Sequence, residues 1–443
     1  MDNKDKFLLM TESDIEPLIM KLSVPTIISM LVTSFYNMAD TFFVGKISTE
    51  ATAAVGVVFS LMAVIQALGF YFGHGSGNFI SRELGKRNME TVSYMASTGF
   101  FSAIFAGILL SVAGLIFVKP LAILLGSTPT ILGDVISYMQ IILTGAPFMM
   151  ASFVLNNQLR FQGSAVYAMT GIVLGAIVNV VLDPIFIFYF NMGVEGAALA
   201  TVLSQMISFI LLLYGMKKGS NIKLSIKKFK PNIYYELNIF KGGFPSLVRQ
   251  GLGSLSTMIL NHVAGGYGDA VIAGMSVVTR VSMFANSALI GFGQGFQPVV
   301  GFNYGAKLYD RVRKAFWFCV KVAFVFLTVM SVLGFVFSEE IIALFRDDIK
   351  VIEIGAFTLR AYCIAFPLNS IIIMCNMLFQ STGNTLSASL MAASRQGLFL
   401  IPSIFFLNYF FGLTGLQCAQ CVSDYCSFVI AIPLIINYFK KLR

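Results

Sequence analysis

Two carboxylates and a carboxamide stand in stretches of this chain that are otherwise apolar. Asp40 lies in S-F-Y-N-M-A-D-T-F-F-V-G, and Asp183 lies in N-V-V-L-D-P. Asn179 precedes Asp183 by four residues, so on a helix the two side chains share one face. Pro184 leaves an earlier backbone carbonyl without its usual donor, which adds an acceptor there. Because a carboxylate inside a membrane is costly and usually lines a pathway, these residues predict a site for a proton or a cation.

The elements that must position these residues are membrane-spanning helices. Hydrophobic residues make up 57% of the chain and charged residues only 12%, which is far from the composition of soluble domains. Apolar runs long enough to cross about 30 Å of hydrocarbon predict an all-α integral membrane protein with twelve transmembrane helices. The start of the chain is polar and acidic and does not have the pattern of a signal peptide. The expected spans are 17–43, 53–79, 92–118, 132–157, 165–190, 195–216, 240–264, 271–299, 312–337, 353–379, 385–411 and 414–438.

An offset of 220 residues maps the first half of the chain onto the second. It pairs Lys21 with Lys241, Pro25 with Pro245, Gly85 with Gly305, Pro147 with Pro367, Asn156 with Asn376 and Gly163 with Gly383. Near the ends the register slips by one, where Gly193-x-x-Gly196 meets Gly412-x-x-Gly415. Prolines and glycines set backbone geometry, so the repeat predicts two six-helix lobes, 12–216 and 238–440, joined by a linker at 217–237. Duplicated bundles of this kind are a common plan of secondary transporters.

Lysine and arginine gather after every second span. They cluster at 82–87, 217–230, 307–314 and 440–443, whereas the alternate loops contain few of them. Positive residues stay on the cytoplasmic side, so we expect a multi-pass protein of the cell membrane whose termini and linker are cytoplasmic. The net charge of +9 then reflects topology and contact with membrane lipid. Binding of nucleic acid would need a basic stripe on a soluble face, and we expect none.

Other candidate sites are weak. The six cysteines lie in apolar segments, and Cys418-Ala-Gln-Cys421 has only half of the ligand spacing of a zinc site. His74 and His262 lie in Gly-rich stretches without an obvious carboxylate neighbour, which favours packed or pore-lining roles. The catalytic motifs of metalloproteases, serine hydrolases and intramembrane aspartate proteases are absent. We therefore expect no enzyme activity, no cofactor and no metal site beyond one for a coupling ion.

Several motifs together resemble a known family. The segment Y-N-M-A-D-T-F-F-V-G, the N-x-x-x-D-P and the two P-x(15)-G helices, in this order and spacing, are similar to the multidrug and toxic compound extrusion family over about residues 12–440. The S-R-Q at 394–396 is most like its MepA branch. The resemblance implies a V-shaped pair of lobes that alternates between inward- and outward-open states. It also implies export of amphipathic, often cationic compounds in exchange for protons or sodium ions, and we expect a monomer.

The resemblance also implies which residues act. Archaeal and DinF-type members build a cation site in the N-lobe from a first-helix Asp, a fifth-helix Asn and Asp, and a sixth-helix Thr. The matching positions are Asp40, Asn179, Asp183 and Thr201. A bending proline, two tyrosines and an asparagine that support this site in the family correspond to Pro25, Tyr36, Tyr138 and Asn156.

The C-terminal lobe departs from the pattern of NorM-type members. These place a Glu eight residues after the proline of the seventh helix, where this chain has Gly253. Arg249, Arg280 and Arg395 lie at membrane depth instead. We interpret the membrane carboxylates as confined to the N-terminal half. The arginines would anchor carbonyls between helices, or Arg249 and Arg395 would line a C-lobe cavity.

Electrostatics indicates how the N-lobe site would drive export. Two nearby carboxylates cannot both ionise cheaply in a low-dielectric cavity, so one shared proton or one bound cation relieves their repulsion. The proton or cation removes the charge that attracts a cationic drug. Binding of the ion and binding of the drug are therefore competitive. The 22 Met and 43 Phe suit varied substrates, although most of them would face lipid or pack between helices. The alternatives are a channel and a flippase for lipid-linked saccharides, in which Arg249 and Arg395 would suit a cationic cavity.

Overall fold

The computed structural model describes residues 3–219, 222–346 and 348–442, and the regular elements in these ranges are all helices. In chain order they are α1 (Asn3–Glu12), α2 (Ile15–Gly45), α3 (Thr49–Gly85), α4 (Met89–Ile116), α5 (Val118–Leu124), α6 (Leu132–Phe161), α7 (Ala165–Pro184), η1 (Ile185–Tyr189), α8 (Gly193–Gly219), η2 (Ile226–Lys228), α9 (Ile233–Gly265), α10 (Asp269–Gly305), α11 (Tyr309–Val336), α12 (Ser338–Ala343), α13 (Ile349–Ala365), η3 (Phe366–Leu368), α14 (Asn369–Thr382), α15 (Thr385–Ala393), η4 (Ser394–Leu398) and α16 (Leu400–Lys441).

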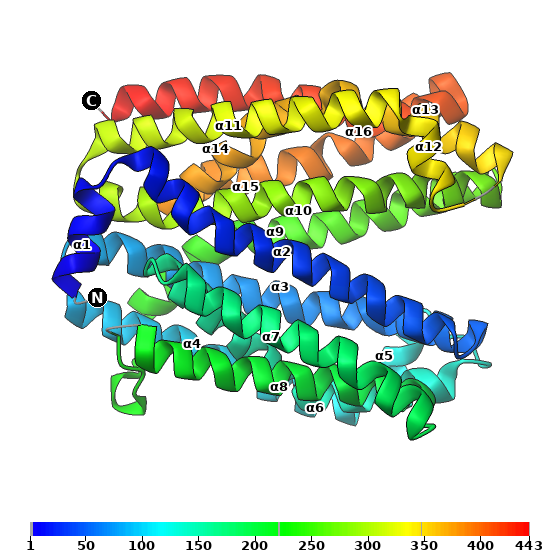
Figure 1. The fold of residues 1–443 in the computed structure, drawn as a ribbon, viewed down its shortest axis with the longest axis horizontal. Helices are drawn as coiled ribbons and strands as arrows, with labels where there is room; N and C mark the ends of the chain where they lie inside the picture. The colour runs from blue at the N-terminus through cyan, green and yellow to red at the C-terminus, as the bar shows by residue number, and fades with distance from the viewer. Residues whose placement is uncertain (1–2, 220–221, 347, 443) are drawn as a thin grey trace.

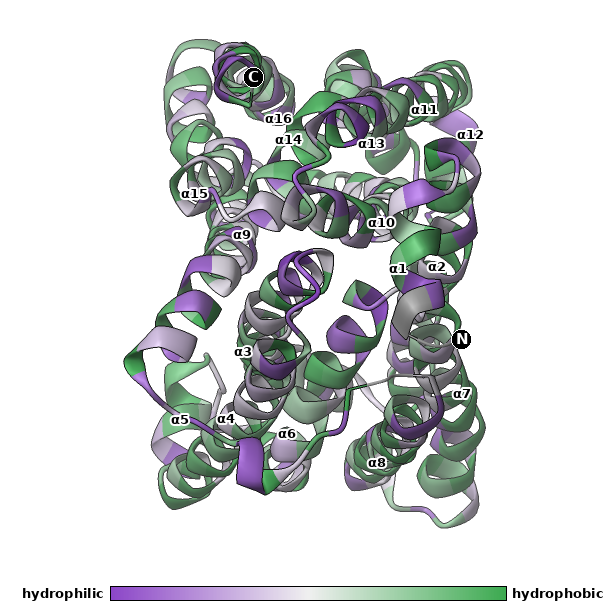
Figure 2. Cartoon of the chain, turned by 90° about the vertical axis from the view of Figure 1, so that its left-hand side faces the viewer, coloured by the Kyte–Doolittle hydropathy of each residue, from purple (hydrophilic) through white to green (hydrophobic). Residues whose placement is uncertain are grey.

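The helices account for twelve membrane crossings. Ten candidate spans in the described residues are long and apolar enough to cross a membrane. The last of them, Thr385–Lys441, is broken at Gly412, whose φ of 57° and ψ of −137° separate two helices. The twelfth crossing is α9, which has 33 residues and packs along α3. The predicted all-α, twelve-helix architecture is therefore confirmed, and hydrophobic residues predominate along the helices in Figure 2.

The helices form two lobes, α2–α8 and α9–α16, that lie one below the other in Figure 1. The lobes meet where α2 packs on α10 and where α3 packs on α9. Both chain termini lie at the same end of the molecule (Figure 1), which we call the terminal end. The last residue of α8 lies there too, because Lys6 Nζ of α1 donates to the carbonyl oxygen of Gly219 at 2.5 Å. The opposite end is called the distal end.

The internal repeat extends to backbone geometry and to side-chain contacts. Left-handed φ angles recur at Arg87 and Lys307 (59° and 62°), at Gly163 and Gly383 (80° and 82°), and at Gly193 and Gly412 (55° and 57°). Asn156 Nδ2 donates to the carbonyl oxygen of Ala168 at 3.0 Å, and Asn376 Nδ2 makes the equivalent bond to Ala388 at 2.7 Å. Both the offset of 220 and its slip to 219 at the glycine pair are thus present in the fold.

Close glycine contacts join the lobes toward the terminal end. A Cβ on Gly85 would overlap the carbonyl oxygen of Phe302, and a Cβ on Gly305 would overlap that of Arg82. The two contacts are related by the repeat, so α3 and α10 cross there about a local twofold axis. The expected spans ended too early, at residues 79 and 299, because the ends of these helices are polar and pack on each other rather than on lipid. The start of α9 at Ile233, before the expected residue 240, lies at the same end.

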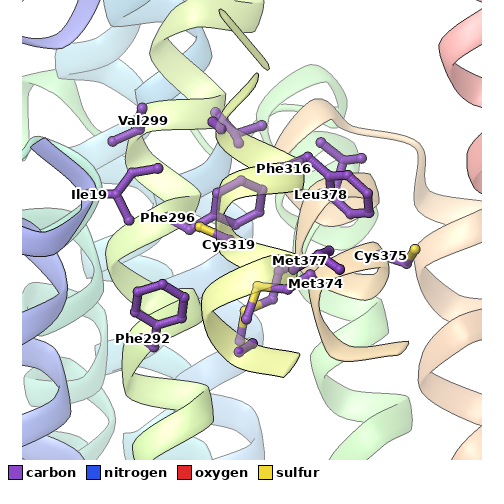
Figure 3. Packing of buried hydrophobic residues seen from close by; sticks show 14 of the residues in the cluster. Ile19, Phe292, Phe296, Val299, Phe316, Cys319, Met374, Cys375, Met377 and Leu378 are labelled. Carbon is purple, nitrogen blue, oxygen red and sulfur yellow. The ribbon is translucent and has the colours of Figure 1, made fainter. Parts of the chain in front are cut away.

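An apolar cluster ties α2 to the second lobe (Figure 3). Phe292, Phe296 and Val299 follow one face of α10, and Ile19 of α2 joins them in the same core. Toward the distal end the neighbours are sparser, since a Cβ on Gly253 would meet no atom within 4 Å. The close glycine contacts between the lobes therefore lie toward the terminal end.

Candidate functional site

The distal half of the first lobe brings two acids together from separate helices. Asp40 lies near the end of α2, and Asp183 lies near the end of α7, a helix that packs against α2. The two carboxylates lie within electrostatic reach of one another. Asp183 is fully buried and Asp40 is half-buried. The pairing of a first-helix acid with a fifth-helix acid thus exists as a spatial cluster.

Four further predicted residues have places around this pair. Asn179 lies one helical turn before Asp183, with Asn179 Nδ2 at 3.4 Å from Asp183 Oδ1. Tyr36 and Tyr138 both lie within electrostatic reach of Asp40 and Asp183, and Tyr138 also lies beside Thr201 of α8. Asn179, Thr201 and Tyr138 are each no more than 2% exposed. The cluster therefore combines residues of α2, α6, α7 and α8.

Several oxygens of this cluster make no hydrogen bond. Asp40 Oδ1, Asn179 Oδ1 and Asp183 Oδ2 are buried acceptors without a donor. None of the ion pairs among the described residues includes Asp40 or Asp183. A buried anion that lacks both a cation and donors is costly unless it takes up a proton or binds a cation. These oxygen atoms are suitable for binding a proton or a hard cation such as Na⁺, because carboxylate and carbonyl oxygens are the usual ligands of hard cations.

Two of the predicted supporting residues lie away from the acids. Pro25 is buried within α2, fifteen residues before Asp40, which corresponds to about 22 Å along a helix. Asn156 is bonded to Ala168 near the start of α7, a similar distance from Asp183. Any effect of these two residues on the acids would be transmitted along α2, α6 or α7.

The second lobe contains a buried carboxylate that sequence reasoning missed. Asp424 of α16 is 1% exposed, and Arg395 Nε donates to its Oδ1 at 2.9 Å. Asn369 Nδ2 donates to Oδ2 at 2.9 Å, and Gln420 Nε2 donates to Oδ1 at 2.8 Å. The interpretation that membrane carboxylates are confined to the first half is therefore wrong. The Gln420-x-x-x-Asp424 spacing was the available signal, since it places both polar groups on one helix face.

The C-lobe arginines differ from one another. Arg395 lies in the π-helical turn η4 and donates to Asp424 and, through Nη2 at 2.9 Å, to Tyr362 Oη, so it does not anchor a backbone carbonyl as expected. Arg249 Nη1 donates to the side-chain oxygen of Asn376 at 3.3 Å. Arg280 is exposed. Of the two arginines expected to line a cavity, Arg395 is neutralised by Asp424. Arg249 has no acidic partner among the described residues.

Sequence reasoning also missed Arg160, near the end of α6. Its side chain is 1% exposed, although it forms no ion pair with any described acid. It contacts the second lobe at Gln294 and Gln297 of α10. The offset of 220 pairs Arg160 with Gln380 and His74 with Gln294, so the repeat placed polar residues at equivalent buried positions in both lobes.

Comparisons with known proteins agree with this architecture. The MatE family model matches residues 25–185 and 245–411, one segment in each lobe. The multidrug export protein MepA of Staphylococcus saprophyticus is 27% identical over 407 residues, which cover 91% of this chain and 90% of the relative. MepA of Staphylococcus aureus is 28% identical over 429 residues, with coverages of 96% and 94%.

Solved structures give the same result. A structure described as the outward-facing conformation of a multidrug resistance MATE family transporter superposes with a TM-score of 0.92 at 25% identity, covering 98% of each chain. A MATE in complex with MaL6 superposes with a TM-score of 0.93 at 25% identity, again over 98% of each chain. Both segments of the family model, the twelve-helix repeat and these superpositions lead to one conclusion: the chain belongs to the MatE family of membrane transporters.

Proposed function

We propose that this transporter is an antiporter, which exports amphipathic and often cationic compounds in exchange for protons or sodium ions. The observation that supports this most directly is the cluster around Asp40 and Asp183. Its buried oxygens Asp40 Oδ1, Asn179 Oδ1 and Asp183 Oδ2 lack donors, and its acids lack a cationic partner among the described residues. A site of this kind can take up and release a cation, because the uncompensated form is costly and the loaded form is not.

The two lobes differ in the state of their buried acids. In the first lobe, Asp183 has one weak donor at 3.4 Å, from Asn179. In the second lobe, Asp424 has three donors, one of them the guanidinium of Arg395. A carboxylate that is already neutralised and fully hydrogen-bonded has little to gain from a second cation. This contrast supports a coupling site in the first lobe alone.

The coupling cycle follows from mutual exclusion. A proton on the Asp40–Asp183 pair, or a cation held by Asp40, Asn179, Asp183 and Thr201, removes the negative charge that attracts a cationic substrate. Loss of the ion restores that charge, so ion and substrate occupy the transporter alternately. Pro25 interrupts the hydrogen-bond ladder of α2, the helix that contains Asp40, and provides a place for α2 to bend when the charge changes.

The substrate class rests on the relatives and on the composition. The curated relatives are named multidrug export proteins. The chain contains 22 Met and 43 Phe, whose flexible thioethers and aromatic faces adapt to ligands of varied shape. We propose export of small amphipathic compounds on this basis, with no need for a cofactor, by a monomer.

The orientation is part of the same proposal. We place the terminal end in the cytoplasm of a cell-membrane protein, because the Lys-rich segment 217–230 and both termini belong to that end. We take residues 12–216 and 238–440 as the lobes and 217–237 as the cytoplasmic linker. The tight packing near the terminal end then corresponds to a state that is closed to the cytoplasm.

Efflux from proteoliposomes tests the proposal. Ethidium is loaded, and a proton gradient and a sodium gradient are imposed separately and then together. Export driven by one gradient and abolished by its ionophore identifies the coupling ion. Equal export with neither gradient would contradict antiport.

The flippase alternative has lost part of its support. It relied on Arg249 and Arg395 as a cationic cavity for a lipid-linked saccharide, and Asp424 neutralises Arg395. Loss of cell-wall precursor flipping when the gene is deleted, with ethidium efflux unchanged, would nevertheless favour the flippase.

A further inference from the structure

A buried polar network crosses from one lobe to the other near the terminal end. Arg160 Nη1 of the first lobe donates to the carbonyl oxygen of Gln294 at 3.0 Å and to Gln297 Oε1 at 3.1 Å, both in the second lobe. Arg160 Nη2 lies 3.3 Å from His74 Nε2. His74 Nδ1 in turn lies 3.2 Å from the hydroxyl of Ser246 in the second lobe.

The network continues within the second lobe. Gln380 Nε2 of α14 donates at 2.8 Å both to Ser246 Oγ and to the carbonyl oxygen of Gly242. Gln297 Nε2 donates to Gln380 Oε1 at 3.4 Å. None of these side chains is more than 7% exposed. The network therefore ties α3 and α6 to α9, α10 and α14 inside a water-poor interface.

These contacts determine the protonation state of His74. Because Arg160 is only a donor, His74 Nε2 must provide a lone pair, which leaves the proton on Nδ1, where the hydroxyl oxygen of Ser246 and the carbonyl oxygen of Phe70 can accept it. An imidazolium has no lone pair on either nitrogen. A second proton on His74 would therefore break the contact with Arg160 and place two positive charges 3.3 Å apart.

The described surroundings of His74 offer no negative charge to compensate for such a charge, and only the backbone carbonyl oxygen of Phe70, which accepts a hydrogen bond from His74, stabilises it. Within the described part of the chain, the charged groups that act on it are Arg160 of α6 and Arg249 of α9. The facing residues of α10 and α14, Gln294, Gln297 and Gln380, are amides. The other helices packed on α3, namely α2, α4 and α8, bring no charged group to it.

From this geometry we infer that His74 and Arg160 form a proton-sensitive latch that holds the two lobes together at the cytoplasmic side. The inference rests on the proposed orientation and on alternating access, but not on the coupling ion or the substrate. Opening toward the cytoplasm separates α3 and α6 from α9 and α10, and it breaks every inter-lobe bond of the latch. The open state exposes His74 to water, where it can accept a proton, whereas the closed state admits only the neutral form. A proton on His74 therefore favours the open state.

The latch has the chemistry of a reversible contact. Arg160 meets amide, carbonyl and imidazole acceptors but no described carboxylate, and its Nε makes no hydrogen bond. When the lobes separate, Nη1 passes from Gln294 and Gln297 to water without leaving a buried anion behind, while Nη2 keeps its first-lobe partners His74 and Asn157. A carboxylate at the same place would hold the lobes together more strongly. Gln297 is the residue at which this difference can be tested.

The test measures the cytoplasmic opening directly, without drug or gradient. Spin labels are attached to cysteines at Lys217 in the first lobe and Lys314 in the second, both exposed near the terminal end, after replacement of the six native cysteines. Distances are measured by double electron–electron resonance in lipid nanodiscs at pH 7.5 and pH 5.5. Histidine in water titrates near pH 6.5, so the ratio of open to closed molecules should rise about tenfold between these pH values.

Four variants separate the latch from other causes. His74→Gln keeps an acceptor toward Arg160 but cannot bind the proton, so its pH response should be much smaller. His262→Gln, a change to the exposed second histidine on α9, should keep the full response. Arg160→Lys keeps the charge but loses the fork of donors, and it should be more open at both pH values. Gln297→Glu should be more closed at pH 7.5 than the parent protein.

The outcomes are distinguishable from failure of the antiport proposal. An unchanged pH response in His74→Gln would overturn the proton-sensitive part. Distances that stay the same in both Arg160→Lys and Gln297→Glu would overturn the latch itself. If Arg160→Lys misfolds, Gln297→Glu still tests the latch, because that change is expected to close the protein further. An efflux assay that showed no coupling at all would contradict antiport without affecting these distances.

Discussion

At the scale of single residues, the two acids of the proposed coupling site have different surroundings from Asp424 and Glu83, the other buried acids among the described residues. Asp183 and Asp40 have no cationic partner in the described part of the chain, whereas Asp424 is held by Arg395 and Glu83 by Lys86. A proton or a cation relieves the uncompensated charge of this pair, whereas the compensated acids gain little from one. This difference leads to two predictions.

The first concerns coupling. Asp40→Asn and Asp183→Asn keep the side-chain volume but remove the exchangeable charge, so gradient-driven ethidium efflux should fall to near background while protein abundance changes little. The double variant should be hardly worse than either single one, because the two acids act as a unit. Thr201→Ala is the milder control, since one lost ligand or hydrogen bond costs on the order of 1 kcal/mol. Efflux that survives both aspartate changes would place coupling elsewhere.

The second concerns the ion pair of the second lobe. Arg395→Met leaves Asp424 buried without its cation, and loss of one partner from such a pair costs roughly 3–5 kcal/mol. Thermal unfolding should show a clear loss of stability, and Arg395→Met combined with Asp424→Asn should recover much of it. Asp424→Asn alone should retain gradient-driven efflux. If that variant is as stable as the parent but uncoupled, the second lobe contains a coupling site after all.

At the scale of elements, glycines allow the backbones of the two lobes to approach one another closely. The ends of α3 and α10 approach so closely that Gly85 and Gly305 each face a carbonyl oxygen of the other helix. Two helices can cross at this distance only if neither has a Cβ at the contact. The glycine pairing seen in the repeat therefore has a direct structural reason.

This contact gives a third prediction. Gly85→Ala should force α3 and α10 apart and weaken closure at the terminal end, with a cost of about 1–3 kcal/mol for overpacking. The spin-label distances between positions 217 and 314 should shift toward the open population. Gly253→Ala is the matched control, because its Cβ would meet no atom within 4 Å, and it should change neither the distances nor coupling. Equal effects of the two alanines would show that the close contact does not hold the lobes.

At the scale of the whole molecule, the orientation decides which opening the latch controls. The linker offers a better reporter than the position suggested by sequence alone. Ser225 is partly covered because its backbone N–H donates to the hydroxyl of Ser97 at 3.2 Å, whereas Lys227 is exposed. Lys119, at the start of the expected distal loop, is also exposed and serves as the reporter for the opposite side of the membrane.

The fourth prediction follows. In a background without native thiols, Lys227→Cys should resist an impermeant thiol reagent in intact cells and react once the cells are opened. Lys119→Cys should react in intact cells. The reverse pattern would invert the orientation and place the latch at the extracellular side.

Local sequence patterns determined the class, the number of crossings, the repeat and the acids of the first lobe. Length and hydrophobicity decide whether a segment spans a membrane, and both can be read without knowing its neighbours. Asn179 and Asp183 share a face because of the helical period alone. The clustering of Asp40 with Asp183, however, was expected from a family resemblance, because their helices are distant in sequence.

Only the tertiary structure decided which buried charges are compensated. Arg395 and Asp424 are 29 residues apart, and Arg160 meets Gln294 across 134 residues, so neither contact has a local signal. The same holds for the ends of α3, α9 and α10, where polar, glycine-rich turns extend beyond the apolar spans because they pack on another helix instead of lipid. Hydropathy reflects the free energy of transferring a segment into hydrocarbon. It does not depend on whether a polar group forms a hydrogen bond with the opposite lobe.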